Sequence, residues 1–293
     1  MAAPGSSTPG KKDRREEARE KARIEREAEK KRQRRNKIFL QGGIGVAVIA
    51  IVVVIVLIVV NGGGGAPTKG PGPKNMASNG ILLVGPDMKA QTTPAAKASG
   101  KAVVTDRAAH KTTANIVTYI DYQCPYCQQF ETTNEAQIKT MVDSGKATLE
   151  IHPISFLDNA SLGNKYSTRA ANAAACVANY DPNDFYAVNT ALFANQPAEQ
   201  TNGKTDAQLL SVLNGAGADS KAIESCVTSK KFVPWVTNSS AALHIGSQTK
   251  VFQGVANTPA VFGGTPTVFV NGEQYKGSLT DPSDFAAFVS ANS

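Results

Sequence analysis

The chain has 293 residues, with 31 Lys and Arg against 24 Asp and Glu, and its formal net charge is +7. The whole excess lies in residues 11–37, where 14 basic residues stand beside 7 acidic ones, so the rest of the chain is neutral. A protein that binds nucleic acid carries its basic residues on the folded domain. The composition therefore excludes a basic nucleic-acid-binding face as the reason for the high charge.

An uncharged, apolar stretch follows this basic segment and predicts a membrane anchor. Residues 38–60 provide 23 positions, and about 20 apolar residues are enough to cross the hydrocarbon core. A cleaved signal peptide is the alternative, but its apolar run covers only roughly 7–15 residues. Because basic residues stay on the cytoplasmic side, we expect a cytoplasmic charged segment (1–37), an anchor (38–60), a flexible linker (61–79) and an extracytoplasmic domain (80–293).

Two of the four cysteines, Cys124 and Cys127, lie in a Cys-Pro-Tyr-Cys motif. The residues before it (115–122) are β-branched and aromatic and predict a buried strand, whereas residues 127–141 contain no Gly or Pro and predict a helix. At the start of a helix, the dipole and the unpaired backbone N–H groups stabilise a thiolate. The setting favours a redox-active pair. The inner dipeptide of this pair is Pro125 and Tyr126.

Two other interpretations of the motif stay open. One is half of a zinc site, although the chain has no second Cys-x-x-Cys, and its histidines lack ligand spacing. The other is an inert crosslink, which would constrain very little of the chain. We expect neither a metal nor a cofactor. The histidines concerned are His110, His152 and His244.

The remaining cysteines, Cys176 and Cys226, lie in two stretches (166–180 and 220–229) that predict helices. A bridge between them closes about fifty residues and would stabilise the fold by roughly 4 kcal/mol. Disulfides persist outside the reducing cytosol, in agreement with the predicted export. The alternative, a second redox relay, lacks the adjacent spacing, so we expect a structural disulfide.

The C-terminal residues supply a second motif. Residues 263–277 predict a short apolar strand, an Asn-Gly hairpin turn and a return strand. An Asp-Pro pair at 281–282 predicts the N-cap and first residue of a last helix. Pro266 directly precedes the first strand. By itself a Thr-Pro bond is usually trans, and a second Thr-Pro ends at Pro259.

The two motifs together resemble the DsbA/DsbG-like branch of the thioredoxin superfamily, above all its membrane-anchored extracytoplasmic oxidoreductases in actinobacteria. They read Tyr-Ile-Asp-Tyr-Gln-Cys-Pro-Tyr-Cys at 119–127 and Gly-Thr-Pro-Thr-Val-Phe-Val-Asn-Gly at 264–272. The likeness covers roughly residues 80–293. It implies an α/β thioredoxin fold with a helical insertion at about 158–255, and residues 81–84 fit an extra leading strand.

The resemblance also implies roles for the site residues. Cys124 is expected to be the nucleophile and Cys127 the resolving thiol. Pro266 is expected to be a cis-proline that faces their disulfide, with Thr258–Pro259 trans. Since a proline has no N–H, the backbone of Thr265 beside it is expected to pair with an extended substrate peptide.

One position departs from the pattern of the family. Many relatives carry a buried carboxylate six residues before the first cysteine, where it accepts a proton, and this chain has Thr118 there. Asp121 is nearer to the motif, but strand alternation predicts that it lies on the opposite face from Thr118. We therefore do not assign Asp121 that role.

The expected function is an extracytoplasmic thiol-disulfide oxidoreductase in the cell membrane that introduces disulfides into exported proteins through Cys124 and Cys127. The resemblance implies exported proteins with cysteines as substrates and a quinone-linked membrane reoxidase, DsbB- or VKOR-like, as partner. A disulfide isomerase or reductase of DsbG type is one alternative. A non-enzymatic, anchored binding module with a structural Cys-x-x-Cys is the other.

Overall fold

The computed structural model describes residues 71–95, 102–105, 110, 114–243 and 262–293. The expected charged segment (1–37) and anchor (38–60) lie outside these residues, as does the Thr258–Pro259 bond. Within the described ranges, no helix combines the length and the apolar character that crossing a membrane requires. The anchor therefore stays a prediction from the sequence.

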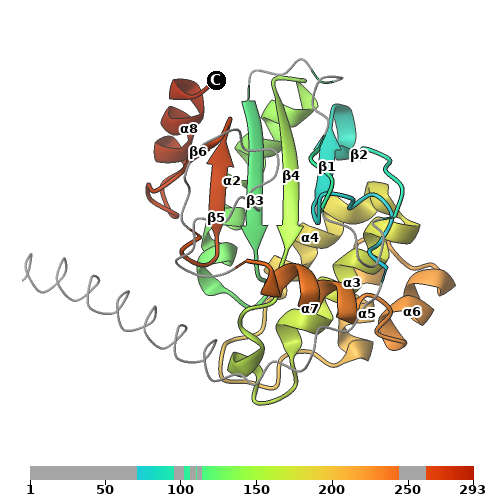
Figure 1. Ribbon diagram of the computed structural model, residues 1–293. Coiled ribbons are helices and arrows are strands. Elements are labelled where there is room, and N and C mark those ends of the chain that lie inside the picture. The colour runs from blue at the N-terminus through green and yellow to red at the C-terminus, as the bar shows by residue number, and fades with distance from the viewer. Residues whose placement is uncertain (1–70, 96–101, 106–109, 111–113, 244–261) are drawn as a thin grey trace, which may run out of the picture. The chain divides into compact units, whose positions relative to one another are not determined.

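A six-stranded mixed sheet forms the centre of the domain, in the order β2-β1-β4-β3-β5-β6 (Figure 1). The central strands β3 and β4 are parallel, and the other neighbouring pairs are antiparallel. A parallel pair needs a crossover connection, which helix α2 (Pro125–Asp143) provides. The strands are β1 (Ile81–Val84), β2 (Lys89–Ala90), β3 (Ala114–Ile120), β4 (Ala147–Pro153), β5 (Thr267–Val270) and β6 (Glu273–Gln274).

Helix α2 and the last helix, α8 (Pro282–Ala291), cover the same face of the sheet (Figure 1). Phe130 of α2 packs edge to face on Phe285 of α8, with 5.2 Å between the ring centroids. The carboxylate of Asp281 caps α8 by accepting a hydrogen bond from the backbone N–H of Ser283 at 2.9 Å. The predicted hairpin and last helix are thus confirmed. The order β-α-β, then β-β-α, is the arrangement that the thioredoxin resemblance implies.

Strand alternation divides the sheet into two packed faces. Ile116 and Ile120 of β3 belong to the larger core, together with Phe130 of α2. Tyr119 lies on the opposite face and stacks on His152 of β4, with 4.3 Å between the ring centroids. A slip of one residue would exchange the two faces, so burial on both sides fixes the register of β3. The register in turn fixes where the strand ends and the cysteine motif begins.

Between β4 and β5 the chain forms a group of helices beside the sheet (Figure 1). Thr205 and Gln208 form a capping box at the start of α5, because each side chain accepts a hydrogen bond from the backbone N–H of the other. The described part of the expected insertion (158–243) is helical. Its α-helices are α3 (Tyr166–Tyr180), α4 (Phe185–Ala194), α5 (Asp206–Gly215), α6 (Lys221–Thr228) and α7 (Val233–Ala241), and its 3-10 helices are η2 (Asp158–Ser161) and η3 (Pro182–Asp184).

The N-terminal end of the described chain packs onto the domain. The leading strand expected at 81–84 is confirmed as β1, and the 3-10 helix η1 (Pro86–Met88) connects it to β2. The flexible linker expected at 61–79 is wrong in its last part. Met76 is fully buried in the core, and Asn75 Nδ2 donates a hydrogen bond to the carbonyl oxygen of Ala178 at 2.8 Å. The sequence does not predict this packing, because only one methionine and one asparagine make these contacts. Two single residues give no periodic hydrophobic pattern in a Gly- and Pro-rich stretch.

Candidate active site

The Cys-Pro-Tyr-Cys motif lies where β3 ends and α2 begins, at the lower end of the sheet in Figure 1. Cys124 precedes the helix in an extended conformation, and Pro125 is the first helical residue. Proline suits this position because its missing N–H would have had no partner there. The carbonyl oxygen of Cys124 accepts the hydrogen bond from the N–H of Gln128 at 3.1 Å, which closes the first turn. Cys124 thus stands at the positive end of a 19-residue helix.

The two cysteines of the motif differ in acidity. Both are free thiols, with Cys124 4% exposed and Cys127 fully buried. A hydrogen bond from Cys127 lowers the pKa of Cys124, burial opposes this shift, and the Thr265 side chain and the Cys127 backbone N–H lower the pKa further. Burial raises the pKa of Cys127 well above its usual range. Cys124 is therefore the thiol that ionises first.

Thr265 and Pro266 lie next to Cys124. The Thr265–Pro266 peptide bond is cis, and the Cys124 thiol donates a hydrogen bond to the Thr265 carbonyl oxygen at 3.2 Å. Pro266 directly precedes β5, and the pairing of β5 with β3 brings this loop to the end of β3. The fold thus brings together the residues of the two sequence motifs, which lie 141 positions apart.

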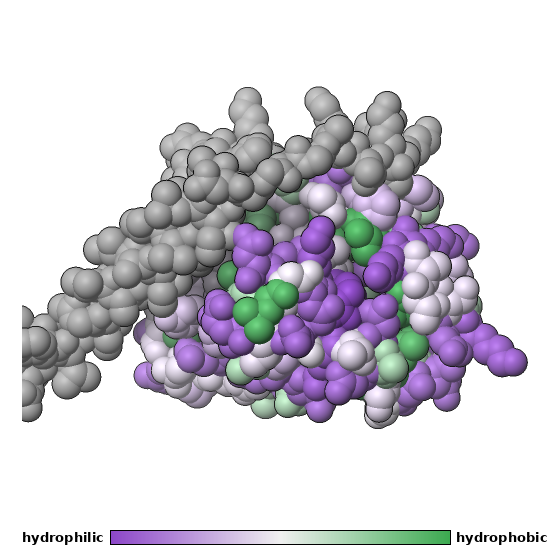
Figure 2. Space-filling view, turned by 90° about the horizontal axis from the view of Figure 1, so that it is seen from below, coloured by the Kyte–Doolittle hydropathy of each residue, from purple (hydrophilic) through white to green (hydrophobic). Residues whose placement is uncertain are grey.

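The described surface at this end of the molecule is largely hydrophilic, with separate hydrophobic spots (Figure 2). Two large apolar side chains near the motif are exposed in the described structure. Tyr126 of the motif is 37% exposed, and Leu162, which follows η2, is 60% exposed. Single exposed apolar side chains of this kind are ordinary on a folded protein and do not by themselves mark an interface.

Two glutamines that the sequence analysis did not assign to the site brace the turn around Cys124. Gln196, which follows α4, donates hydrogen bonds from its amide Nε2 to the carbonyl oxygens of Cys124 at 3.0 Å and Tyr122 at 3.1 Å. Gln123 is fully buried, and its Nε2 donates to the carbonyl oxygen of Ala160 at 3.3 Å. Gln196 lies 72 positions from Cys124, so no local sequence signal identifies it.

A buried acid lies in the same turn. Thr118, at the position of the family's carboxylate, is fully buried, and its Oγ1 has no hydrogen-bond partner among the described residues. The carboxylate of this region belongs to Asp121, also fully buried. Burial raises the pKa of Asp121 to about 6, against the lowering effect of its hydrogen bonds. The charge of Asp121 raises the pKa of Cys124. Asp121 is therefore an ionisable group that acts on the Cys124 thiol, although strand alternation gave no reason to assign it to the site.

A second acid lies one helical turn after Cys127. Glu131 is half-buried, and its Oε2 accepts a hydrogen bond from Nδ2 of Asn189 in α4 at 2.9 Å. The Oδ1 atom of the same Asn189 accepts a hydrogen bond from the Tyr122 hydroxyl at 3.0 Å. Burial raises the pKa of Glu131 to about 7. These bonds form a polar connection between the active-site helix and the helical insertion.

The second pair of cysteines lies away from this turn. Cys176 in α3 and Cys226 in α6 form a disulfide, with 2.09 Å between the sulfurs and 5.8 Å between the Cα atoms. Both residues are buried in the larger core of the domain. The bridge joins α3 to α6 through two cysteines that are 50 positions apart. Neither helix contains a residue of the Cys-Pro-Tyr-Cys motif.

The described residues contain no group of three or more His, Cys, Asp or Glu side chains that could hold a metal ion. His152 faces Glu150, with 3.1 Å between Nε2 and Oε1. His110 Nε2 lies 3.1 Å from Oε1 of Gln91. His244 lies outside the described residues.

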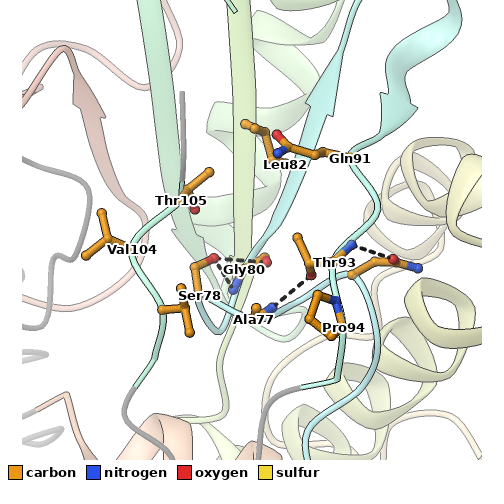
Figure 3. Close-up of a pocket in the computed structure, with 11 residues that line it drawn as sticks. Ala77, Ser78, Gly80, Leu82, Gln91, Thr93, Pro94, Val104 and Thr105 are labelled. Atoms are coloured by element: carbon orange, nitrogen blue, oxygen red, sulfur yellow. Dashed lines mark hydrogen bonds between the residues drawn. The ribbon is translucent and has the colours of Figure 1, made fainter. Parts of the chain in front are cut away.

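A cavity of about 180 Å³ opens beside β1 and β2 (Figure 3). Leu82, Thr93 and Thr105 are among its lining residues, and Ser78 Oγ donates a hydrogen bond to the Gly80 carbonyl oxygen at 3.1 Å within it. None of the lining residues belongs to the cysteine motif, to α2 or to the loop before β5. The cavity is therefore separate from the redox site.

Residues 106–291 match the family model described as Thioredoxin, and the chain belongs to this thioredoxin family. Among solved structures it is similar to the reduced disulfide bond oxidoreductase DsbG from Mycobacterium tuberculosis, with 30% identity, coverage of 65% of this chain and 83% of that chain, and a TM-score of 0.51. It is also similar to reduced DsbA from the same organism, with 25% identity, coverage of 73% and 92%, and a TM-score of 0.54.

Curated proteins include a shorter match. The chain is 36% identical over 110 residues to the serine/threonine-protein kinase PknE of Mycobacterium tuberculosis. The match covers 36% of this chain and 19% of the kinase, so the chain spans about a fifth of the curated relatives it matches. Of its structural relatives, DsbG is a disulfide bond oxidoreductase.

Proposed function

We propose that this protein is an oxidase that introduces disulfides into exported proteins through Cys124 and Cys127, and that residues 38–60 anchor it in the cell membrane with the catalytic domain outside. The observation that carries the proposal is the position of Cys124, which stands at the start of α2 and bonds to the Thr265 carbonyl at 3.2 Å. The lowered pKa of Cys124 supports it. A stabilised thiolate favours the reduced pair, which makes the disulfide a stronger oxidant.

The reaction begins with the Cys124–Cys127 disulfide. A substrate thiolate attacks the Cys124 sulfur, the bond to Cys127 breaks, and Cys127 leaves with the electron pair. Its raised pKa favours uptake of a proton at that point. A second substrate thiolate then attacks the substrate sulfur of the mixed disulfide, and Cys124 leaves as a thiolate. The substrate loses two electrons, the enzyme pair gains them, and the low pKa of Cys124 makes it a good leaving group.

The loop before β5 supports a polypeptide as the substrate. The backbone of Thr265 adjoins the Cys124 sulfur, and an extended peptide can pair with a free main-chain edge. Exported proteins with cysteine pairs are therefore the proposed substrates. Each turnover leaves Cys124 and Cys127 reduced, so the enzyme needs an electron acceptor. We propose a quinone-linked membrane reoxidase, DsbB- or VKOR-like, which an anchored enzyme would meet in the same membrane.

A disulfide isomerase or reductase of DsbG type is the second candidate. The 30% identity to DsbG of Mycobacterium tuberculosis favours it. An isomerase uses its reduced form, since the Cys124 thiolate attacks a wrong disulfide in the substrate. A reductase requires a pair with a more negative reduction potential, whereas an isomerase requires a pair that a partner keeps reduced in its compartment.

The reduction potential of the Cys124–Cys127 pair tests the proposal. The full chain in detergent is equilibrated with glutathione buffers, and the alkylated and oxidised forms are counted by mass spectrometry. For an oxidase we expect a potential less negative than about −200 mV, whereas a value near about −270 mV is typical of a reductase such as thioredoxin. The Cys124→Ser variant is the control, because it cannot form the pair and should show no transition.

A further inference from the structure

The carboxylate of Asp121 joins two loops at the active site. Its Oδ1 accepts a hydrogen bond from the N–H of Gln123 at 2.8 Å, within the turn that leads to Cys124. Its Oδ2 accepts from the N–H groups of Phe156 at 2.8 Å and Leu157 at 3.0 Å, in the loop that follows β4. A fully buried carboxylate is stable only when such bonds replace its water. Both of its oxygens are used to connect backbone to backbone.

The loop that follows β4 runs along the active-site turn and carries an unusual residue. The N–H of Ile154 bonds to the carbonyl of Ile120 at 2.8 Å, and Gln123 Nε2 bonds to the carbonyl of Ala160 at 3.3 Å. Leu162 then adopts φ 50, in the left-handed region, and is 60% exposed. Leucine rarely adopts this conformation. Strained residues of this kind are found at functional sites, and the strain persists only where the surroundings hold the backbone in place.

The sheet order places this loop on one side of Cys124 and the substrate-pairing backbone on the other. β3, which leads to Cys124, lies between β4 and β5. The loop that Asp121 holds follows β4, whereas Thr265 and Pro266 directly precede β5. A polypeptide whose sulfur reaches Cys124 along Thr265 therefore meets the loop after β4 on its other flank.

We infer that Asp121 is a positioning residue for thiol-disulfide exchange, because its carboxylate holds the loop 156–162 against the active-site turn, where this loop forms one wall of the surface that receives the substrate polypeptide. The inference rests on the proposed function. It assigns the carboxylate no proton transfer. Small dithiols need no wall, so the loop matters only for substrates with a main chain.

Asp121 can affect the reaction in two ways, through the effect of its charge on Cys124 and through its hydrogen bonds to the loop. The experiment must separate these two effects. Cys124, Ser167 and Tyr166 are the groups that interact with this carboxylate besides the backbone N–H donors. The charge raises the pKa of Cys124, so its removal should lower that pKa. Release of the loop should instead weaken polypeptide binding. Asp121→Asn changes both, whereas Gln123→Ala frees the loop at Ala160 and leaves the charge in place.

The experiment compares these two variants with wild type in the full chain. Hydrogen exchange should be about tenfold faster at the Phe156 and Leu157 amides in Asp121→Asn, since bonds to a charged acceptor are lost. The KM for a peptide with two cysteines should rise about tenfold, while oxidation of dithiothreitol changes less than threefold. Gln123→Ala should raise the same KM by a smaller factor. The pH midpoint of Cys124 alkylation should fall in Asp121→Asn alone.

Asp206→Asn is the matched control, because Asp206 is a bonded carboxylate that pairs with Arg169 at 2.8 Å in the helical insertion. It should leave the peptide KM at the wild-type value. Equal losses toward peptide and dithiothreitol, or an unchanged peptide KM in Asp121→Asn, would overturn the inference. If Asp121→Asn does not fold, an unchanged peptide KM in Gln123→Ala overturns it. If wild type oxidises neither substrate, the proposed function fails instead, and the amide exchange still reports whether Asp121 holds the loop.

Discussion

The Cys124 thiol donates a hydrogen bond to the carbonyl oxygen of Thr265 across 3.2 Å, although 141 positions separate the two residues. The antiparallel pairing of β5 with β3 makes this contact. β3 ends at the cysteine motif, and the loop that contains Thr265 ends where β5 begins. The reactive sulfur therefore lies against the main chain that we expect to pair with the substrate.

After reduction, Cys124 should react with iodoacetamide before Cys127 at about pH 6. Hydrogen bonding lowers the pKa of Cys124, while burial raises that of Cys127, and only the thiolate reacts quickly. Peptide mapping by mass spectrometry after short exposure measures the order. Modification of Cys127 first would contradict the assignment of the nucleophile.

Replacement of the resolving thiol should trap the reaction halfway. In the Cys127→Ala variant, Cys124 forms mixed disulfides with exported proteins, and no second thiol of the enzyme can release them. Non-reducing gels of the extracytoplasmic fraction should show adducts that disappear when dithiothreitol reduces the mixed disulfide. Cys124→Ala is the control and should show none. A lack of adducts in Cys127→Ala would remove the main support for exchange with proteins.

The Cys176–Cys226 disulfide should matter for stability and not for turnover. Its loop spans 50 residues, and removal of a native bridge of this kind typically lowers the free energy of unfolding by about 2–5 kcal/mol. The double variant Cys176→Ala, Cys226→Ala should therefore melt earlier in calorimetry. Its oxidation of a dithiol, measured well below the new melting temperature, should equal that of wild type. Loss of that activity in a folded variant would instead indicate an electron relay.

The hydroxyl of Thr265 should tune the nucleophile. The Thr265 side chain lowers the pKa of Cys124, so Thr265→Val should raise the pH at which Cys124 becomes a thiolate. Valine has nearly the same shape and keeps the backbone carbonyl. Absorbance of the thiolate near 240 nm against pH measures the shift, and Thr190→Val, far along α4, serves as control. A shift toward lower pH would contradict this reading of the site.

Glu131 should make stability depend on pH between about 4.5 and 7. Burial raises the pKa of Glu131 from 4.5 to about 7 in the folded protein. The folded state thus holds its proton longer than the unfolded state, and stability falls as pH rises through this window. Glu131→Gln removes the charge and leaves a side-chain oxygen that can still accept the hydrogen bond from Asn189.

The variant should therefore match wild type near pH 4 and exceed its unfolding free energy by about 1–2 kcal/mol at pH 8, allowing for the half-buried carboxylate. Urea unfolding at both pH values measures the difference. Glu224→Gln, on the exposed face of α6, should show no such pH dependence. A variant that is less stable than wild type at pH 8 would show that the Glu131 carboxylate stabilises the fold.

Features that depend on neighbouring residues were predictable from the sequence. The strand before Cys124, the helix after it, the capping box of Thr205 and the last helix after Asp281 all rest on contacts within a few positions. The strand and helix around Cys124 and Cys127 favoured a redox-active pair, whereas the roles of Thr265 and Pro266 came from the resemblance, because the sequence alone left a trans proline open.

Tertiary structure alone decided what surrounds these motifs. Strand alternation does not locate the Asp121 side chain, because β3 ends at Ile120. Beyond Ile120 the turn directs the carboxylate to the backbone of a loop more than thirty residues away. Gln196 and Met76 show the same limit. Each contacts partners that the order of strands and the packing of helices bring near, and a single hydrogen bond or buried side chain at such a distance leaves no periodic signal in the chain.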